Sequence, residues 1–246
     1  MLYWNVICIL MTILDVFYLP FLLSFYYTEY QTDIPQLDFI IYVFFVLKMV
    51  LHFNTAYYSK GNLMKERQKI ARHYLRKNFA FDFMALMLSM PRVIFGVNTL
   101  IYFEVIRVFR ILSLFKAINK FEDNLQFSLS MTCILRLIKL FGSLIIVTHL
   151  LACIVHGIGL SEENGTSWLI VFGFREQPIF RRYIVSAYWT VTTMITVGYG
   201  DITPTNDFER MYAIFSMFTA SAVFGYSMNT INVVVEEMNE YKSIKK

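Results

Sequence analysis

The chain has 246 residues, of which 57% are hydrophobic and only 16% are charged. Soluble domains carry roughly 25% charged residues, so this composition excludes an ordinary soluble protein and requires lipid as part of the solvent. The net charge of +4 does not favour nucleic-acid binding. Cys8, Cys133 and Cys153 lie in apolar runs without zinc-type spacing, and they predict neither a disulfide framework nor a metal site.

Six segments dominated by apolar residues are predicted to cross a membrane. They occupy residues 2–25, 37–58, 78–90, 100–119, 125–160 and 207–240. The first has no basic residues at its start and carries Asp15, so we interpret it as a span and not as a signal peptide. A carboxylate inside a span is costly, and Asp15 is therefore expected to have a cation as its partner.

The loops after the first two spans differ sharply in charge. Residues 24–38 contain three acids and no Lys or Arg, whereas residues 59–79 contain seven Lys or Arg and one acid. Because basic loops stay on the cytoplasmic side, the 59–79 loop is predicted to be cytoplasmic. An even number of spans then places both termini in the cytoplasm, and we expect a multi-pass protein of the plasma membrane.

The fourth span carries a repeating charge pattern. Every third position from residue 107 to 116 reads Arg107, Arg110, Ser113 and Lys116, which gives a cation at three of four points. Such a grid forms a stripe on a helix, and charged stripes in spans mark function, so we predict a voltage-sensor-like segment. The alternative is a surface helix with a basic face. Two arginines crossing the field in four subunits provide at most ~18 kcal/mol per 100 mV, which favours a shallow voltage response.

Three other spans carry features of their own. Lys48 lies within the second span, and Pro91 is expected to end the third, which has Asp82 near its cytoplasmic end. The first half of segment 125–160 is expected to lie along the inner membrane surface and the second half to span. There, His149, Cys153 and His156 share one helical face, which suits either a metal ion or, as we favour, helix packing.

The most informative stretch follows a short amphipathic helix, 183–193, that contains Tyr188, Trp189, Thr192 and Thr193. Its sequence is Thr196-Val197-Gly198-Tyr199-Gly200-Asp201. Glycine tolerates positive φ, so successive carbonyls can turn toward one axis and replace the hydration shell of a cation. The alternative is a glycine turn between two helices.

The sixth span contains Gly225, which is expected to mark a bend or close packing, since a glycine within a helix costs about 1 kcal/mol. Asn229 and Asn232 follow one turn apart. They either line a water-filled path or form hydrogen bonds between helices.

These motifs together resemble those of the tetrameric six-span potassium channels. The similarity is strongest to the branch that holds the ether-à-go-go, hyperpolarisation-activated and cyclic-nucleotide-gated channels, and it covers nearly the whole chain. Besides the filter string, the matching positions are Trp4, Pro20, Phe53, Thr55, Ile70-Ala71, Tyr74-Leu75, Phe81-Asp82, Arg107, Arg110, His149, Ala152-Cys153, Tyr188-Trp189, Phe224-Gly225-Tyr226 and Asn229.

The resemblance implies an all-α membrane protein with a four-helix sensor-like domain, 1–120. A pore domain, 121–240, would hold a re-entrant pore helix and the filter, and a short tail, 241–246, would follow. It further implies a potassium-selective, voltage-modulated channel that assembles as a homotetramer or heterotetramer, with each sensor beside its own subunit's pore. No cofactor is expected beyond permeant K⁺, and no catalytic residue.

Residue roles also follow from the resemblance. Thr196 to Gly200 would coordinate dehydrated K⁺, with the Thr196 hydroxyl at the inner end. Asp201 would brace the outer mouth, and Gly225 would be the gating hinge. Asp15 and Asp82 would be the acids that stabilise the sensor cations.

The chain departs from the family pattern at Lys48, where relatives carry an acid. This cation would either repel Arg107 or Arg110, or pair with Asp15 or Asp82. No cyclic-nucleotide-binding domain is expected on this chain and no cytoplasmic domain precedes the first span, so a minimal channel and a fragment both stay open. The alternatives are a non-conducting regulatory subunit that joins longer channels, or a weakly selective cation channel. A membrane enzyme has little support, because no paired nucleophile and base is visible.

Overall fold

The computed structural model describes residues 2–26, 36–59, 62–95, 107–111, 114–115, 118–119, 128–161 and 166–244. The chain forms two compact units. The first comprises Met1–Leu19 and Tyr30–Ile118, and the second comprises Pro20–Glu29 and Asn119–Lys246. Each is described here by itself.

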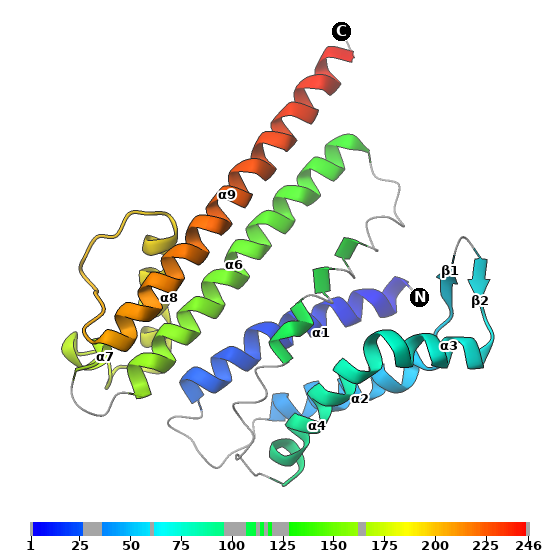
Figure 1. The fold of residues 1–246 in the computed structure, drawn as a ribbon, viewed down its shortest axis with the longest axis horizontal. Helices are drawn as coiled ribbons and strands as arrows, with labels where there is room; N and C mark the ends of the chain where they lie inside the picture. Colours follow the sequence, from blue (N-terminus) through cyan, green and yellow to red (C-terminus); the bar gives the residue numbers. More distant parts are fainter. Residues whose placement is uncertain are drawn as a thin grey trace. The chain divides into compact units, whose positions relative to one another are not determined.

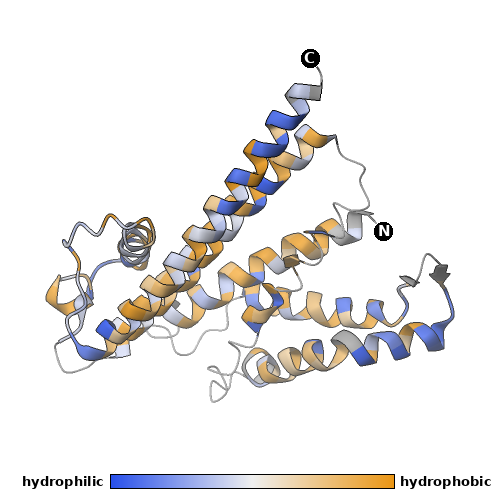
Figure 2. Ribbon diagram, turned by 45° about the horizontal axis from the view of Figure 1, so that its top comes forward, coloured by the Kyte–Doolittle hydropathy of each residue, from blue (hydrophilic) through white to orange (hydrophobic). Residues whose placement is uncertain are grey.

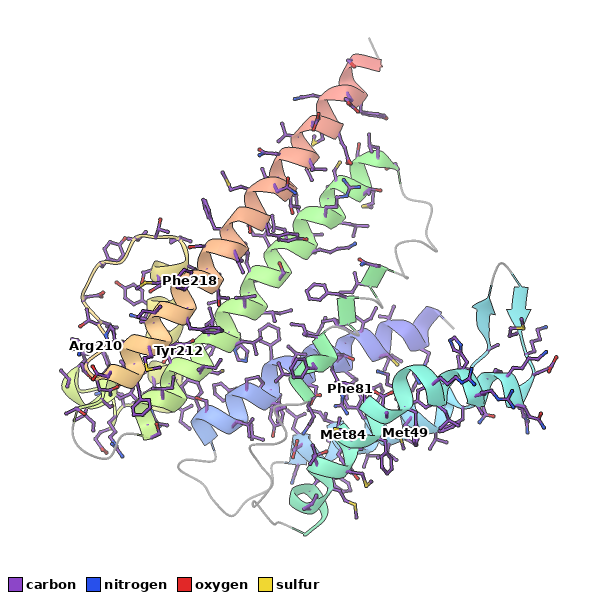
Figure 3. The ribbon with its side chains drawn as sticks, in the orientation of Figure 1. Met49, Phe81, Met84, Arg210, Tyr212 and Phe218 are labelled. Carbon is purple, nitrogen blue, oxygen red and sulfur yellow. The ribbon has the colours of Figure 1, made fainter. Side chains whose placement is uncertain are left out.

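The first unit is built mainly from apolar helices. Its elements are α1 (Leu2–Phe21, whose last two residues belong to the second unit), α2 (Gln36–His52), β1 (Tyr57–Ser59), β2 (Asn62–Met64), α3 (Arg67–Tyr74), the π-helical turn η2 (Leu75–Phe79) and α4 (Ala80–Phe95). Helices α2 and α4 pack together around Ile41, Phe45 and Leu86, and Met11 and Leu14 of α1 pack on the same cluster. Figure 3 labels Met49 of α2 and Met84 of α4 in this unit.

One expectation for this unit is confirmed in its main part, and one is corrected. The described residues are nearly all helical, as expected, and the exception is a short antiparallel pair of β1 and β2 in which Tyr57 pairs with Met64. Tyrosine favours strands, and only two residues of sequence separate β1 from β2, as in a hairpin. Pro91 does not end the third apolar segment, since α4 continues to Phe95. A proline removes one backbone hydrogen bond, which an apolar helix can absorb when neighbouring groups adjust.

The second unit is organised around two long helices, α6 (Leu129–Ser161) and α9 (Asp207–Ile244). They lie side by side, with the short α7 (Trp168–Val171) and α8 (Ile179–Met194) near one end (Figure 1). The π-helical turn η1 (Leu22–Tyr26) packs against α6. The core gathers residues of all four helices: Leu151, Val155, Trp168, Leu169, Val185, Trp189, Met194, Tyr212, Ala213 and Ala220.

Helix α6 corrects the expectation that the first half of segment 125–160 lies along the membrane surface. It is one unbroken helix of 33 residues, about 50 Å long. No proline interrupts it, so the part that carries Arg136 and Lys139 continues the spanning part without a turn.

Among the described residues, three helices are long and apolar enough to cross a bilayer: Val6–Phe25, Leu129–Ser161 and Asp207–Tyr241. A shorter apolar helix covers Ala80–Pro91. In Figure 2 apolar residues cover most of α6, and hydrophilic residues gather toward the C-terminal end of α9. These lengths and this patterning are those of a helical membrane protein.

Candidate functional site

The glycine-containing stretch predicted as a filter is fastened to the end of α8. The backbone N–H groups of Val197 and Gly198 both donate to the carbonyl oxygen of Thr192, at 2.9 and 3.2 Å. The N–H of Thr196 donates to the carbonyl of Thr193 at 3.1 Å. The amides at the start of the stretch therefore point back at α8 and cap carbonyls that its last turn would otherwise leave unpaired.

The backbone of this stretch alternates in handedness. Thr196, Gly198 and Gly200 have φ of 60°, 54° and 76°, whereas Val197 and Tyr199 have negative φ. Left- and right-handed residues in alternation gather N–H groups on one side of the chain and leave the carbonyls for the other. The two glycines adopt this conformation at no steric cost. Thr196 does so despite its Cβ, which sequence reasoning did not predict.

The carbonyl oxygens of residues 196–200 form a consecutive row at the end of α8. Within the described part of the chain, none of them accepts a hydrogen bond. Backbone carbonyls normally have a partner, and a consecutive row without one needs an external ligand such as water or a cation. The arrangement leaves these five carbonyl oxygens available to water or to a cation.

Two aromatic side chains and one carboxylate hold the far end of the stretch. The Tyr188 hydroxyl donates to Asp201 Oδ2 at 2.8 Å, and this hydrogen bond raises the pKa of the phenol. The rings of Tyr188 and Tyr199 are nearly parallel, with centroids 6.4 Å apart. Trp189, the next residue of α8, is buried and lies 6.4 Å from the Tyr212 ring of α9. The stretch is thus supported by α8 at both ends.

Sequence reasoning missed Glu209, which organises the chain between the filter and α9. Its buried carboxylate accepts the N–H of Trp168 at 3.0 Å and the N–H of Thr205 at 2.8 Å. An acid in the first turn of a helix is a common capping signal, but its bond to Trp168 spans 41 positions and has no local signature.

Helix α9 turns one face to α6 and leaves the other uncovered. Gly225, Asn229 and Asn232 are all exposed, and nothing lies within 4 Å of a Cβ built on Gly225. Close packing therefore does not explain this glycine within the single chain, and α9 continues through it without interruption. Large apolar side chains of α9 are also exposed, among them Met211, Phe215 and Phe218; Figure 3 labels Phe218.

The first unit contains a buried charge cluster centred on Asp15. Arg107 Nη2 and Arg110 Nη1 bind its two carboxylate oxygens, the latter at 2.7 Å. Arg107 Nη1 also lies 3.6 Å from Asp38 Oδ1. All four side chains are at most 3% exposed. Asp15 thus has the cation partner that a carboxylate inside a span requires. Lys116 and Ser113 lie outside the described residues.

Phe45 connects this cluster to Lys48. The Arg110 guanidinium stands over the Phe45 ring, 3.6 Å from its centroid, and Lys48 Nζ lies 5.2 Å from the same centroid. The predicted acid Asp82 does not contact either arginine; it accepts a 2.8 Å hydrogen bond from the Tyr74 hydroxyl. Both cations gain from the negative face of the ring.

The face with His149, Cys153 and His156 is used for packing contacts. His149 Nδ1 is 3.0 Å from the Tyr183 hydroxyl, and His156 Nδ1 is 3.1 Å from the Ser24 hydroxyl. Ser24 also donates to the Cys153 carbonyl at 2.7 Å. In the described ranges no group of three His, Cys, Asp or Glu side chains could hold a metal ion.

Fold and site together define a helical protein of membrane character that presents a row of backbone oxygens suited to a cation. The family model described as ion transport protein matches residues 1–243. The chain therefore belongs to the ion transport protein family, and the resemblance seen in its motifs is confirmed.

Curated relatives are potassium channels of plants and animals. The chain is 25% identical over 248 residues to potassium channel AKT1 of Arabidopsis thaliana, covering 98% of this chain and 28% of the relative. It is 24% identical to the human voltage-gated delayed rectifier potassium channel KCNH5, covering 96% and 26%. It is 28% identical to potassium channel KAT4 of rice, covering 96% and 41%. The chain thus spans well under half the length of these relatives.

Proposed function

We propose that this chain is a pore-forming subunit of a potassium-selective channel. The observation that carries the proposal is the row of carbonyl oxygens at residues 196–200, unclaimed within the described chain and oriented by alternating φ. Carbonyl dipoles in such a row replace the hydration shell of K⁺ without binding the ion too tightly to release it. The Thr196 hydroxyl extends the row at its inner end, and Asp201, held by Tyr188, braces the outer end.

The functional unit is a tetramer, because one chain supplies a quarter of each carbonyl ring. Exposure of the filter and of the apolar side chains on the uncovered face of α9 supports assembly with further copies or related subunits. Six spans cross the plasma membrane, with both termini in the cytoplasm. Residues 1–120 form the voltage sensor, residues 121–240 form the pore and residues 241–246 form a tail.

Voltage acts on this channel through the buried arginines. Arg107 and Arg110 are the gating charges, with Lys116 as a third cation on the same segment. Asp15 neutralises them in the position seen, and Asp82 is the second sensor acid, nearer the cytoplasmic side. In the pore, Gly225 lets α9 bend, while Asn229 and Asn232 face the water-filled path below the filter.

Expression of the chain in oocytes, followed by voltage clamp with ion substitution, tests the proposal. We expect potassium currents that Gly198→Asp abolishes. Gly173→Asp is the matched control, because Gly173 also has positive φ (70°) and also has open space around it. Currents that carry Na⁺ as well as K⁺ would contradict the selectivity. Currents only with a longer partner channel would favour a regulatory subunit.

A further inference from the structure

Lys48 introduces a cation that does not move with the predicted sensor segment. It is carried by α2, one helical turn beyond Phe45, and both its ammonium and the Arg110 guanidinium stand over the Phe45 ring. The two cations therefore share one aromatic ring. Lys48 therefore belongs to the same electrostatic cluster as the two arginines, although it is on a different element.

The charged groups of this cluster follow one another along α2. Asp38 begins the series and contacts Arg107, Phe45 lies beneath Arg110, and Lys48 comes next. At 1.5 Å per residue, Phe45 and Lys48 lie about 10 Å and about 15 Å beyond Asp38 along the helix. Arg107, Arg110 and Lys48 thus form a column of three cations, two from the fourth apolar segment and the third from α2.

The sequence explains why α2 supplies the third cation. The fourth segment places Arg at 107 and 110, but the next point of its three-residue grid is Ser113. Asp82, the acid expected near the cytoplasmic side, already accepts a hydrogen bond from the Tyr74 hydroxyl at 2.8 Å. An arginine that moved one grid step inward would meet a cation at Lys48 and an acid that already has a hydrogen-bond partner.

We propose that Lys48, which is fixed on α2, takes the place of a third cation on the sensor segment. Its charge holds Arg107 and Arg110 in the position in which they contact Asp15. The column has its three cations in line only when Arg107 and Arg110 are in this position, because Lys48 is on α2 and does not move with the arginines. Inward movement of Arg110 past Phe45 is opposed by the like charge. The inference rests on the proposed sensor role of residues 1–120 and predicts a sensor that moves little charge.

Displacement currents test this directly, recorded in the full chain with permeant ions replaced by impermeant ones. The wild type is expected to move less than about one elementary charge per subunit, although Arg107 and Arg110 together carry two. Lys48→Asp is expected to raise the displaced charge toward two per subunit, and Lys48→Met to raise it by a smaller amount. Lys69→Asp is the charge-matched control, because Lys69 is exposed on α3 and pairs with Glu66 at the surface.

The inference is overturned if the wild type already moves about two charges per subunit. It is equally overturned if both Lys48 variants leave the displaced charge unchanged, or if Lys69→Asp raises it as much as Lys48→Asp. If Lys48→Asp does not reach the surface, the wild type and Lys48→Met still decide the question. Because displacement currents need no conduction, loss of K⁺ current alone contradicts the proposed pore and not the role of Lys48.

Discussion

The Tyr188 hydroxyl on α8 donates a 2.8 Å hydrogen bond to Asp201, the residue that directly follows the carbonyl row. Tyr188 also stacks beside Tyr199 inside that row. One side chain of α8 thus contacts both Tyr199 within the row and the carboxylate that follows the row. The geometry of the outer carbonyls therefore depends on a contact 13 positions away in sequence.

Tyr188→Phe is expected to weaken the filter without removing it. The substitution deletes the hydroxyl and keeps the ring that stacks on Tyr199, so selectivity for K⁺ over Na⁺ should persist. Open times in single-channel recordings should shorten by a few-fold, because the filter loses a hydrogen bond to a charged acceptor. Tyr226→Phe, at an exposed tyrosine of α9, is the control. Unchanged open times in Tyr188→Phe would show that this bond does not support conduction.

Asp15→Asn should prevent most of the protein from reaching the cell surface. The change leaves Arg107 and Arg110 buried without their shared carboxylate, and breaking a buried ion pair costs about 3–5 kcal/mol. Surface biotinylation measures the loss. Asp207→Asn breaks a pair in which the acid is 91% exposed, so it should have little effect. Equal surface levels for the two variants would argue against a structural role for the Asp15 cluster.

Arg136 and Glu237 connect the start of α6 to the end of α9 through a 2.5 Å ion pair. Because both side chains are about one-third exposed, the pair is expected to contribute at most about 1 kcal/mol per subunit. Arg136→Glu and Glu237→Arg should each shift the half-activation voltage of the channel in the same direction. The double reversal should restore it, because it re-forms the pair. Additive shifts in the double variant would mean that the two side chains are not coupled.

Ser24→Ala should lower the thermal stability of the second unit. The Ser24 hydroxyl is buried, donates to the Cys153 carbonyl and lies beside His156. Removing a buried partner costs about 1–3 kcal/mol, and each kcal/mol lowers Tm by roughly 2–4 °C in a domain of this size. Scanning fluorimetry of detergent-solubilised protein gives the shift. Ser161→Ala, which removes an exposed hydroxyl at the C-terminal end of α6, should leave Tm unchanged.

The parts of this protein that the sequence predicts well are governed by local chemistry. The alternation of Gly198 and Gly200 predicts the positions of positive φ. The length of the apolar runs predicts the long helices α6 and α9. Asp15 required a cation because any carboxylate in that setting does. The cations that bind Asp15 are Arg107 and Arg110, which lie more than 90 positions away in the sequence. Their three-residue spacing predicts a charged stripe but does not identify the acid that they bind.

The features that sequence reasoning missed depend on tertiary context. The hydrogen bonds of Glu209 with Trp168 and of Tyr188 with Asp201 join residues 41 and 13 positions apart in the sequence. Neither spacing matches the repeat of a helix or a strand, so the sequence pattern does not predict these contacts. Thr196 adopts positive φ because three amides are tied to the end of α8, which overrides its own preference. The sequence predicts that Pro91 ends the third apolar segment, but α4 continues through it to Phe95.

Reversal-potential measurements test the central claim most directly. Membranes that contain the chain should show a current whose reversal potential shifts by about 59 mV for each tenfold change in external K⁺. Replacing external Na⁺ by a large organic cation at constant K⁺ should leave that potential unchanged. A reversal potential that follows Na⁺ as closely as K⁺ would contradict a potassium-selective path through residues 196–200.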